Sequence, residues 1–425
     1  MNKALNHSYV YVTGSLVQAL VPFFILPVLA RIISPSQFGL LMLLVSIGTV
    51  LSFGFSLGIP AILSRDLIFQ QQKSRHLKDV AKSYQSLLIW LSIMFFLFSV
   101  YGQQYLTMTI FALSISLAFS LSVIQIKLSI LRAEFRSLRF ALLAIASTSF
   151  PMLMITLISI YRIGNIYFYY VGTSLFLTLI LNFNYLFKLP SASTVSTTKK
   201  LILIAYPMIF HGMSISLFQY GDKIASFLGL GSEFVAQVVV ISLFMTAPML
   251  LLNTINNAWL PTTIELFKKS SVQAFDYLHK SSKNLSIFIT IISIGIVIFS
   301  KFIVSMFVPN TYNQIEISRA IIIGLSFTPL YVIYLQNTHL FTVAKKFKSM
   351  AKITPIAAVI QFIFTFGLVS SIGLSAPAYG LLLAIFVQVV LTSIKAKSLR
   401  KLNKLPLYLS IFLSSFNIVY LNFFF

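Results

Sequence analysis

Apolar stretches recur along the whole chain, separated by short polar segments. Since about 20 apolar residues in a helix cross the roughly 30 Å hydrocarbon core of a bilayer, each stretch predicts a membrane-spanning helix. The predicted segments are 9–32, 39–63, 83–101, 105–131, 140–161, 166–187, 201–230, 234–260, 284–308, 319–343, 352–373 and 376–394. The pattern therefore predicts an all-α polytopic integral membrane protein with twelve transmembrane helices in two six-helix bundles.

The C-terminal stretch 405–425 departs from this symmetry, because it is apolar, free of charge and long enough to span. It either forms a thirteenth helix or lies along the membrane interface, and we favour the additional span. The last part of the chain, 401–425, is accordingly treated as an extra membrane segment.

A polar, low-complexity stretch lies at the midpoint of the chain, with the sequence LPSASTVSTTKK over residues 189–200. Such composition is typical of a linker. We therefore expect an N-terminal bundle over 1–188, a cytoplasmic linker over 189–200 and a C-terminal bundle over 201–400. Two six-helix bundles joined in this way indicate parallel repeats with a substrate path between them.

Basic residues alternate with the predicted helices. If the N-terminus is cytoplasmic, all but five of the 31 Lys and Arg residues fall in or next to the inner loops. The five exceptions are Arg31, Arg162, Lys223, Lys301 and Arg319. This asymmetry follows the positive-inside rule and predicts a multi-pass protein with a cytoplasmic N-terminus.

The net charge of +23 would indicate a nucleic-acid partner if the basic residues gathered on one face of a soluble protein. Here they are spread over seven inner regions, which is typical of anchoring against anionic inner-leaflet lipid. We expect the lipid bilayer as a partner, and no nucleic acid.

Catalytic chemistry is disfavoured by composition. The chain has five scattered His, eight acidic residues and no Cys, with no metal-ligand spacing and no paired carboxylates. It contains neither a G-x-x-x-x-G-K-[ST] loop nor a G-x-G-x-x-G fingerprint. We expect no enzyme, no cofactor and no metal.

Polar residues deep in the seventh segment are candidates for function, because ionisable groups in hydrocarbon are costly unless they face a polar interior. Gly212, Ser216, Gln219 and Lys223 share one helical face, and Asp222 lies on the adjacent stripe. This face either lines a cavity or places Asp222 and Lys223 at the outer interface. Neighbouring residues do not face each other on a helix, so the sequence does not establish a salt bridge between them.

Further candidates lie in the fourth, eighth and tenth segments. Gln125 is too deep to be an interface anchor, whereas Arg132 is either an anchor or a functional residue. Asn253 and Asn257, with Asn256 between them, either bond helix to helix or bind sugar. Gln336, Asn337 and His339 present the same two alternatives.

Prolines within the predicted helices remove backbone hydrogen bonds and favour kinks. They occur at Pro22 and Pro27 in the first segment, Pro248 in the eighth and Pro329 in the tenth. Kinked helices suit alternating access, although they are common in membrane proteins.

Several short motifs follow one another along the chain. They are LPVLARIISPSQFG over residues 26–39, GIPAILSR over 58–65, LRAEFR over 131–136, YGDKI over 220–224 and GSEF over 231–234. Together they resemble the polysaccharide-exporter branch of the multidrug/oligosaccharidyl-lipid/polysaccharide (MOP) superfamily. In length, helix count and motif order the resemblance covers residues 1 to 400.

The resemblance, within that branch to Wzx-type O-antigen flippases, implies two bundles forming a V around a cationic cavity. Carried over by motif, the implied functional positions are Arg31, Arg65, Arg132, Asp222 and Lys223, with Asp222 as a coupling-ion candidate. The segment 405–425 departs from the twelve-helix pattern of the family.

The implied activity is translocation of undecaprenyl-pyrophosphate-linked oligosaccharide from the cytoplasmic to the periplasmic leaflet of a bacterial inner membrane. A monomer is expected, with other polysaccharide-assembly membrane proteins as further partners. The alternatives are a cation-coupled multidrug or small-molecule exporter of the same superfamily and a membrane polysaccharide polymerase. The former would need a buried carboxylate, and the latter acidic motifs or a large outer loop.

Overall fold

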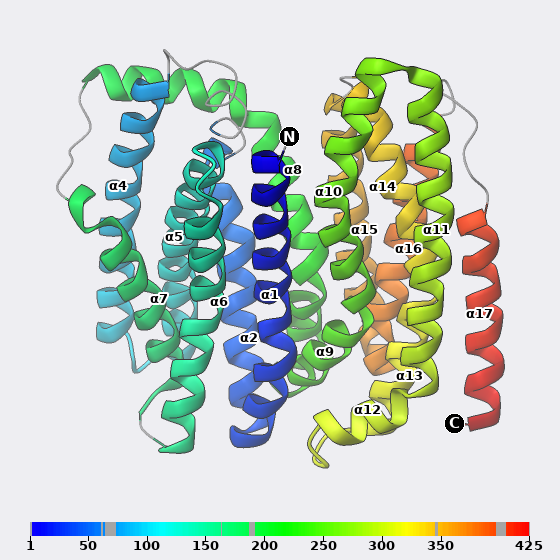
Figure 1. The fold of residues 1–425 in the computed structure, drawn as a ribbon. Helices are drawn as coiled ribbons and strands as arrows, with labels where there is room; N and C mark the ends of the chain where they lie inside the picture. The colour runs from blue at the N-terminus through cyan, green and yellow to red at the C-terminus, as the bar shows by residue number, and fades with distance from the viewer. Residues whose placement is uncertain are drawn as a thin grey trace. The chain divides into compact units, whose positions relative to one another are not determined.

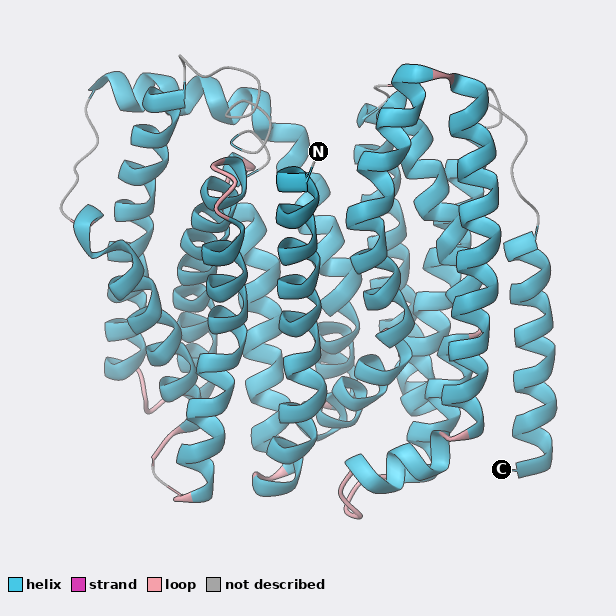
Figure 2. Ribbon diagram, in the orientation of Figure 1, coloured by secondary structure: helices cyan, strands magenta, loops and turns pink. Residues whose placement is uncertain are grey.

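The computed structural model describes residues 2–60, 63, 74–162, 164–186, 192–344, 347–396 and 405–424. Over these residues the chain is helical and contains no strand (Figure 2). It divides into two compact units, residues 1–216 and 217–425, which are described one at a time.

Over its described residues, unit 1 consists of six helices, a short 3-10 turn and the first part of α8 (Figure 1). The elements are α1 (Asn2–Ile32), α2 (Pro35–Phe55), α4 (Ser74–Tyr101), α5 (Leu106–Ala133), α6 (Ser137–Ile160), α7 (Ile166–Asn182), η1 (Phe183–Tyr185) and α8 (Ala192–Leu230). Of the spanning helices in this unit, α5 is the most enclosed, with 72% of its most apolar window buried. It packs against α2, α4, α6 and α7 and forms the centre of the unit.

Unit 2 contains the second part of α8 and the remaining helices. They are α9 (Ser232–Met245), α10 (Ala247–Lys269), α11 (Ser271–Ile298), α12 (Ser300–Phe307), α13 (Gln314–Leu325), α14 (Thr328–Val343), α15 (Phe347–Ile372), η2 (Gly373–Ser375), α16 (Ala376–Ala396) and α17 (Leu405–Phe424). In the stretch formed by α13 and α14, 83% of the most apolar window is buried, and this stretch is the core of the unit.

Over the described residues, each of the thirteen predicted apolar segments overlaps one helix or a consecutive pair of helices. By length and composition, nine helical stretches of the described residues can cross a membrane, or ten if a bent pair counts as one span. One of these stretches, residues 351–396, includes both α15 and α16. The prediction of an all-α polytopic membrane protein is confirmed.

The motif around residue 35 is the start of a helix. Ser34 accepts a hydrogen bond from the backbone N–H of Gln37, and Pro35 occupies the first helical position. Serine caps exposed helix donors, and proline there loses no hydrogen bond, since the first N–H groups of a helix have no partner within it. The helix therefore begins at Pro35, four residues before the apolar segment predicted from 39.

Prolines have different consequences along the chain. A 48° bend separates α9 from α10, where Pro248 lies in the first turn of the second helix, and Pro329 likewise begins α14. Breaks at both prolines agree with the predicted kinks. By contrast, α1 is a single helix that continues through Pro22 and Pro27.

The polar stretch predicted as a linker is helical from Ala192 onward. Residues 192–200 are the first turns of α8, so this polar stretch is helical and continues directly into the apolar part of the same helix. Serine and threonine tolerate a helix when the segment that follows propagates it. Along the sequence, the boundary between the two compact units falls between Ser216 and Leu217, inside α8.

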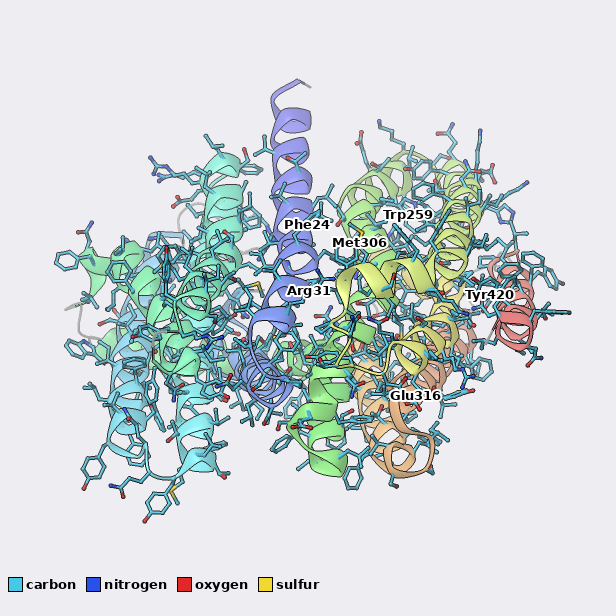
Figure 3. The ribbon with its side chains drawn as sticks, turned by 90° about the horizontal axis from the view of Figure 1, so that it is seen from below. Phe24, Arg31, Trp259, Met306, Glu316 and Tyr420 are labelled. Atoms are coloured by element: carbon cyan, nitrogen blue, oxygen red, sulfur yellow. The ribbon has the colours of Figure 1, made fainter. Side chains whose placement is uncertain are left out.

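The C-terminal apolar stretch forms α17, a helix long and apolar enough to span, which packs beside α11 (Figure 1). Asn417 donates to the carbonyl of Ile322, and Ser410 donates to the carbonyl of Ser326. Tyr420, labelled in Figure 3, donates to the carbonyl of Ile298. These three hydrogen bonds join α17 to α11 and to the C-terminal end of α13.

Candidate functional site

A buried ion pair lies in α8. The Nζ atom of Lys223 is 2.8 Å from Oδ1 and 3.0 Å from Oδ2 of Asp222. The two residues are only 2% and 5% exposed, Asp222 being the more enclosed. Although adjacent side chains diverge on a helix, the long lysine chain bends back to reach the carboxylate. The salt bridge that the sequence left open is therefore present.

Three neighbours complete this cluster. Ser242 of α9 donates a hydrogen bond to Oδ2 of Asp222. The Lys223 ammonium also donates to the carbonyl of Gln219, one turn earlier, at 3.2 Å. It lies 5.7 Å from the ring centroid of Tyr220, within the range of a cation–π contact. The carboxylate and the ammonium are thus each bonded to more than one group.

The pairing has an electrostatic reason. Removing a charge from water costs several kcal/mol, and only a partner of opposite sign with further hydrogen bonds offsets that cost. Of the seven acidic residues that the structure describes, Asp222 alone is buried. The cluster is the place in the described chain where an anion and a cation are held together away from solvent.

The other candidates of unit 1 are dispersed. Arg31 is exposed in the last turn of α1, where Figure 3 labels it. Gln125 donates from Nε2 to the Ser52 hydroxyl at 2.9 Å and so joins α5 to α2. Arg132 is exposed, with its guanidinium 4.9 Å from the ring centroid of Phe140. Arg65 lies outside the described residues.

The other candidates of unit 2 lie in α8 and α10. The side chain of Gln219 is exposed, although its carbonyl belongs to the ion-pair cluster. Asn253 accepts a hydrogen bond from the Tyr331 hydroxyl at 2.9 Å, which joins α10 to α14. Asn257 lies in α10, and its side chain lies outside those described.

A polar layer extends from this contact between α10 and α14. Asn256 Oδ1 is 2.7 Å from His339 Nε2, and the His339 ring lies edge-on to Trp259 with centroids 4.4 Å apart. Two residues before His339, Asn337 donates to Thr392 of α16. These side chains bond helix to helix, the first of the two alternatives for them; sugar binding stays a prediction.

The sequence missed two participants, Ser242 and Tyr331. Both are single polar residues in apolar stretches, and no pattern marks them. Only a position opposite an identified partner, a carboxylate for Ser242 and an amide for Asn253, gives them significance. Among the described residues no group of three or more His, Asp or Glu is placed to hold a metal ion.

Comparison with protein families gives one match. The model of the family described as polysaccharide biosynthesis protein matches residues 4–267, which is more than half of the chain. A search of curated proteins found no match.

Solved structures share the fold at low sequence identity. An inward-facing multidrug resistance MATE family transporter of the MOP superfamily has a TM-score of 0.69 at 13% identity, covering 91% of this chain and 98% of its own. An outward-facing structure of such a transporter has a TM-score of 0.60 at 16% identity, with coverages of 94% and 96%.

A third similar structure is a MOP superfamily transporter from Pyrococcus furiosus, whose binding pocket is described as having reversed polarity. It has a TM-score of 0.57 at 14% identity and covers 94% of this chain and 96% of its own. At these identities the likenesses establish the fold.

Proposed function

Because this chain belongs to the polysaccharide biosynthesis protein family and has the fold of MOP superfamily transporters, we propose that it is a flippase for lipid-linked oligosaccharides. The substrate is an undecaprenyl-pyrophosphate-linked repeat unit of O-antigen or a related surface polysaccharide. It moves by alternating access from the cytoplasmic to the periplasmic leaflet of a bacterial inner membrane, with the protein's N-terminus in the cytoplasm. The family match carries this proposal.

The physical task is to pass a sugar head group and a pyrophosphate through hydrocarbon while the polyprenyl tail stays in lipid. Burying an unpaired anion in a bilayer is costly, so the protein must supply cations. Lys and Arg are the side chains that bind phosphate. Transport of this kind forms and breaks no covalent bond.

Lys223 is the cation that we assign to the pyrophosphate. In the described structure its ammonium is held by Asp222, which offsets the cost of burying it. A pyrophosphate carries more negative charge than a carboxylate and competes with Asp222 for the ammonium. Asp222 then holds a proton or faces another cation, which would couple the cycle to a gradient. Arg31 is the second cation assigned to the substrate.

The ion pair also bears on the alternative of a cation-coupled drug exporter. Such a protein needs a buried carboxylate that can bind the ion or the drug. Asp222 is the buried acidic residue among those described, and its two oxygens face Lys223 and Ser242. Because both oxygens of this carboxylate are already bonded within the protein, the ion pair supports a flippase for a lipid-linked substrate over an exporter of small cations.

Leaflet exchange in proteoliposomes tests the proposal. The purified chain is reconstituted with a fluorescent undecaprenyl-pyrophosphate oligosaccharide, and a membrane-impermeant quencher reports how much of it changes leaflet. We expect protein-dependent exchange that falls about tenfold in Lys223→Gln, the equivalent of one lost charged hydrogen bond. No exchange of this lipid, with gradient-driven efflux of small cations instead, would refute the flippase.

Lys269→Gln is a matched control. Lys269 pairs with Glu265 at 2.9 Å, so each substitution removes one lysine from one salt bridge. The side chain of Lys269 is 66% exposed and that of Lys223 only 6%. We expect exchange by Lys269→Gln to equal that of the unmodified protein. Equal losses in the two variants would remove the assigned role from Lys223.

A further inference from the structure

A cavity of about 570 Å³ lies within unit 1, lined by residues of α4, α5, α6 and α7 and of the turn that joins α5 to α6. Its polar lining residues are Lys82, Gln85, Lys127, Glu134, Arg136 and Arg139. We call it the basic pocket. It shares no residue with the Asp222–Lys223 cluster, which belongs to unit 2.

The turn between α5 and α6 positions the charged groups. The Arg136 N–H donates to the Leu131 carbonyl and the Phe135 N–H to the Arg132 carbonyl, which closes the end of α5 as a Schellman motif. Phe135 takes the left-handed position with φ of 57°, where glycine is usual. This tight turn brings Glu134 and Arg136 to the lining of the pocket, with Arg139 in the first turn of α6.

The charges of the pocket are unbalanced. Four of its lining residues are basic and one, Glu134, is acidic. The Glu134 carboxylate is 3.0 Å from Nε of Arg136. Lys127 donates to the carbonyl of Leu181 near the end of α7. Lys82 lies 3.7 Å from Oδ1 of Asp79, so the basic residues at the cavity still outnumber the acidic ones. Several like charges around one cavity favour an anion with more than one negative charge.

Gln85 gives a second and independent indication of a ligand. This side chain is fully buried and lines the pocket. Its Nε2 donates to the carbonyl of Val123, whereas its Oε1 has no hydrogen-bond partner. A buried acceptor without a partner costs about 1–3 kcal/mol. A hydroxyl donor on the ligand would satisfy it.

The remaining wall of the pocket is apolar and reaches the outside of the unit. Leu142 of α6 lines the pocket and is 59% exposed, so the cavity opens along a spanning helix. Leu177 and Leu181 of α7 form part of the same wall. A ligand with a polar head in the pocket can therefore leave hydrocarbon chains against α6 and α7.

We propose that the basic pocket binds the head group of a phosphate-bearing membrane lipid, with the phosphate between Lys82, Lys127 and Arg139 and a head-group hydroxyl donating to Gln85. Basic pockets between transmembrane helices bind anionic head groups. Phosphatidylglycerol of the bilayer and a polyprenyl-pyrophosphate glycan share this chemistry. The proposal does not depend on the transport function.

Lipid binding to the full-length protein, followed by native mass spectrometry, tests it. We expect phosphatidylglycerol to bind more tightly than phosphatidylcholine. The pair Lys127→Gln with Arg139→Gln should weaken phosphatidylglycerol binding by about tenfold or more, because each basic residue near a membrane surface contributes about 1 kcal/mol. The matched control Lys280→Gln with Lys283→Gln removes two exposed lysines in the first half of α11. It should leave binding nearly unchanged, because salt screens charges that lie far from the pocket.

Two further measurements test the contact with Gln85 and identify which lipid occupies the pocket. Gln85→Leu should weaken binding of phosphatidylglycerol but not of phosphatidic acid, which lacks the glycerol hydroxyls. An equimolar polyprenyl-pyrophosphate glycan is then added to the protein with bound phosphatidylglycerol. If the glycan displaces phosphatidylglycerol from the unmodified protein but does not bind the variant Lys127→Gln with Arg139→Gln, the site belongs to the glycan lipid. If it displaces none, the site belongs to the bilayer lipid. Equal losses in the pocket pair and the control pair would overturn the proposal.

Discussion

Unit 2 buries a single lysine beside a carboxylate, whereas unit 1 gathers four basic residues around an open pocket with one carboxylate. The Lys223 side chain is 6% exposed, while that of Arg136 is 51% exposed. Both arrangements place cations at membrane helices.

The two regions differ in how far solvent reaches their charged groups. A fully enclosed ammonium must be neutralised within the protein, because desolvation costs several kcal/mol. A cation at the edge of a pocket keeps part of its hydration, so an excess of positive charge is tolerated there. The enclosed pair is therefore sensitive to the loss of one partner, and the open pocket is available to an outside anion.

The largest expected effect comes from breaking the enclosed pair. Asp222→Ala leaves the Lys223 ammonium buried without its carboxylate, and we expect the free energy of unfolding to fall by about 3–5 kcal/mol. Denaturant unfolding of the purified protein in detergent measures it. Glu265→Ala, which removes the carboxylate of the exposed pair with Lys269, is the control and should cost less than about 1 kcal/mol.

Removing the charges of both Asp222 and Lys223 distinguishes a role of the ion pair in stability from a role in transport. Asp222→Leu combined with Lys223→Leu should recover most of the stability lost in Asp222→Ala, because no charge remains to be desolvated. Leaflet exchange should stay low in this variant. A stable double variant with full exchange would show that the pair is structural only.

A smaller effect is expected from Ser242. Ser242→Ala removes the hydroxyl that donates to Asp222 while leaving the ion pair in place, and should lower the free energy of unfolding by about 1.5 kcal/mol. The same measurement applies. Thr246→Ala is the control, because the hydroxyl of Thr246, at the C-terminal cap of α9, donates to the backbone carbonyl of Ser242 and not to a carboxylate. A loss in Ser242→Ala as small as that of the control would argue against a strong bond to the carboxylate.

In the basic pocket the corresponding substitution should hardly change stability. Glu134→Gln removes the carboxylate beside Arg136, and because the arginine is half exposed we expect a cost below about 1 kcal/mol. It should instead raise the affinity for phosphatidylglycerol about fivefold, since one unit charge is worth about 1 kcal/mol near a membrane surface. Native mass spectrometry gives the affinity; an unchanged or weaker one would contradict the excess of positive charge as the cause of binding.

Salt should distinguish the two regions most finely. Raising the ionic strength from about 0.05 M to about 0.5 M shortens the distance over which charges act, and should therefore weaken lipid binding in the basic pocket. The stability loss of Asp222→Ala should stay the same, because ions do not reach an enclosed pair. Salt-dependent losses at Asp222 would show that the pair is hydrated.

Much of the fold could be predicted from the chain. Each apolar segment is a helix because its length and hydropathy require one in a bilayer, and α17 follows from the same reasoning. The helical state of residues 192–200 was missed, since a polar Ser/Thr composition is typical of linkers and the helix there depends on the segment that follows it.

The sequence by itself determined the helices, the family motifs and the polar residues that membrane burial makes conspicuous, among them Asp222, Lys223, Gln125 and Asn253. Only the tertiary structure decided their partners. Hydropathy and periodicity are local properties of a helix, while a contact such as that of Ser242 with Asp222, 20 positions apart, depends on which faces meet. The basic pocket is the clearest case, because Lys82 and Arg139 belong to separate helices and only packing brings their charges to one cavity.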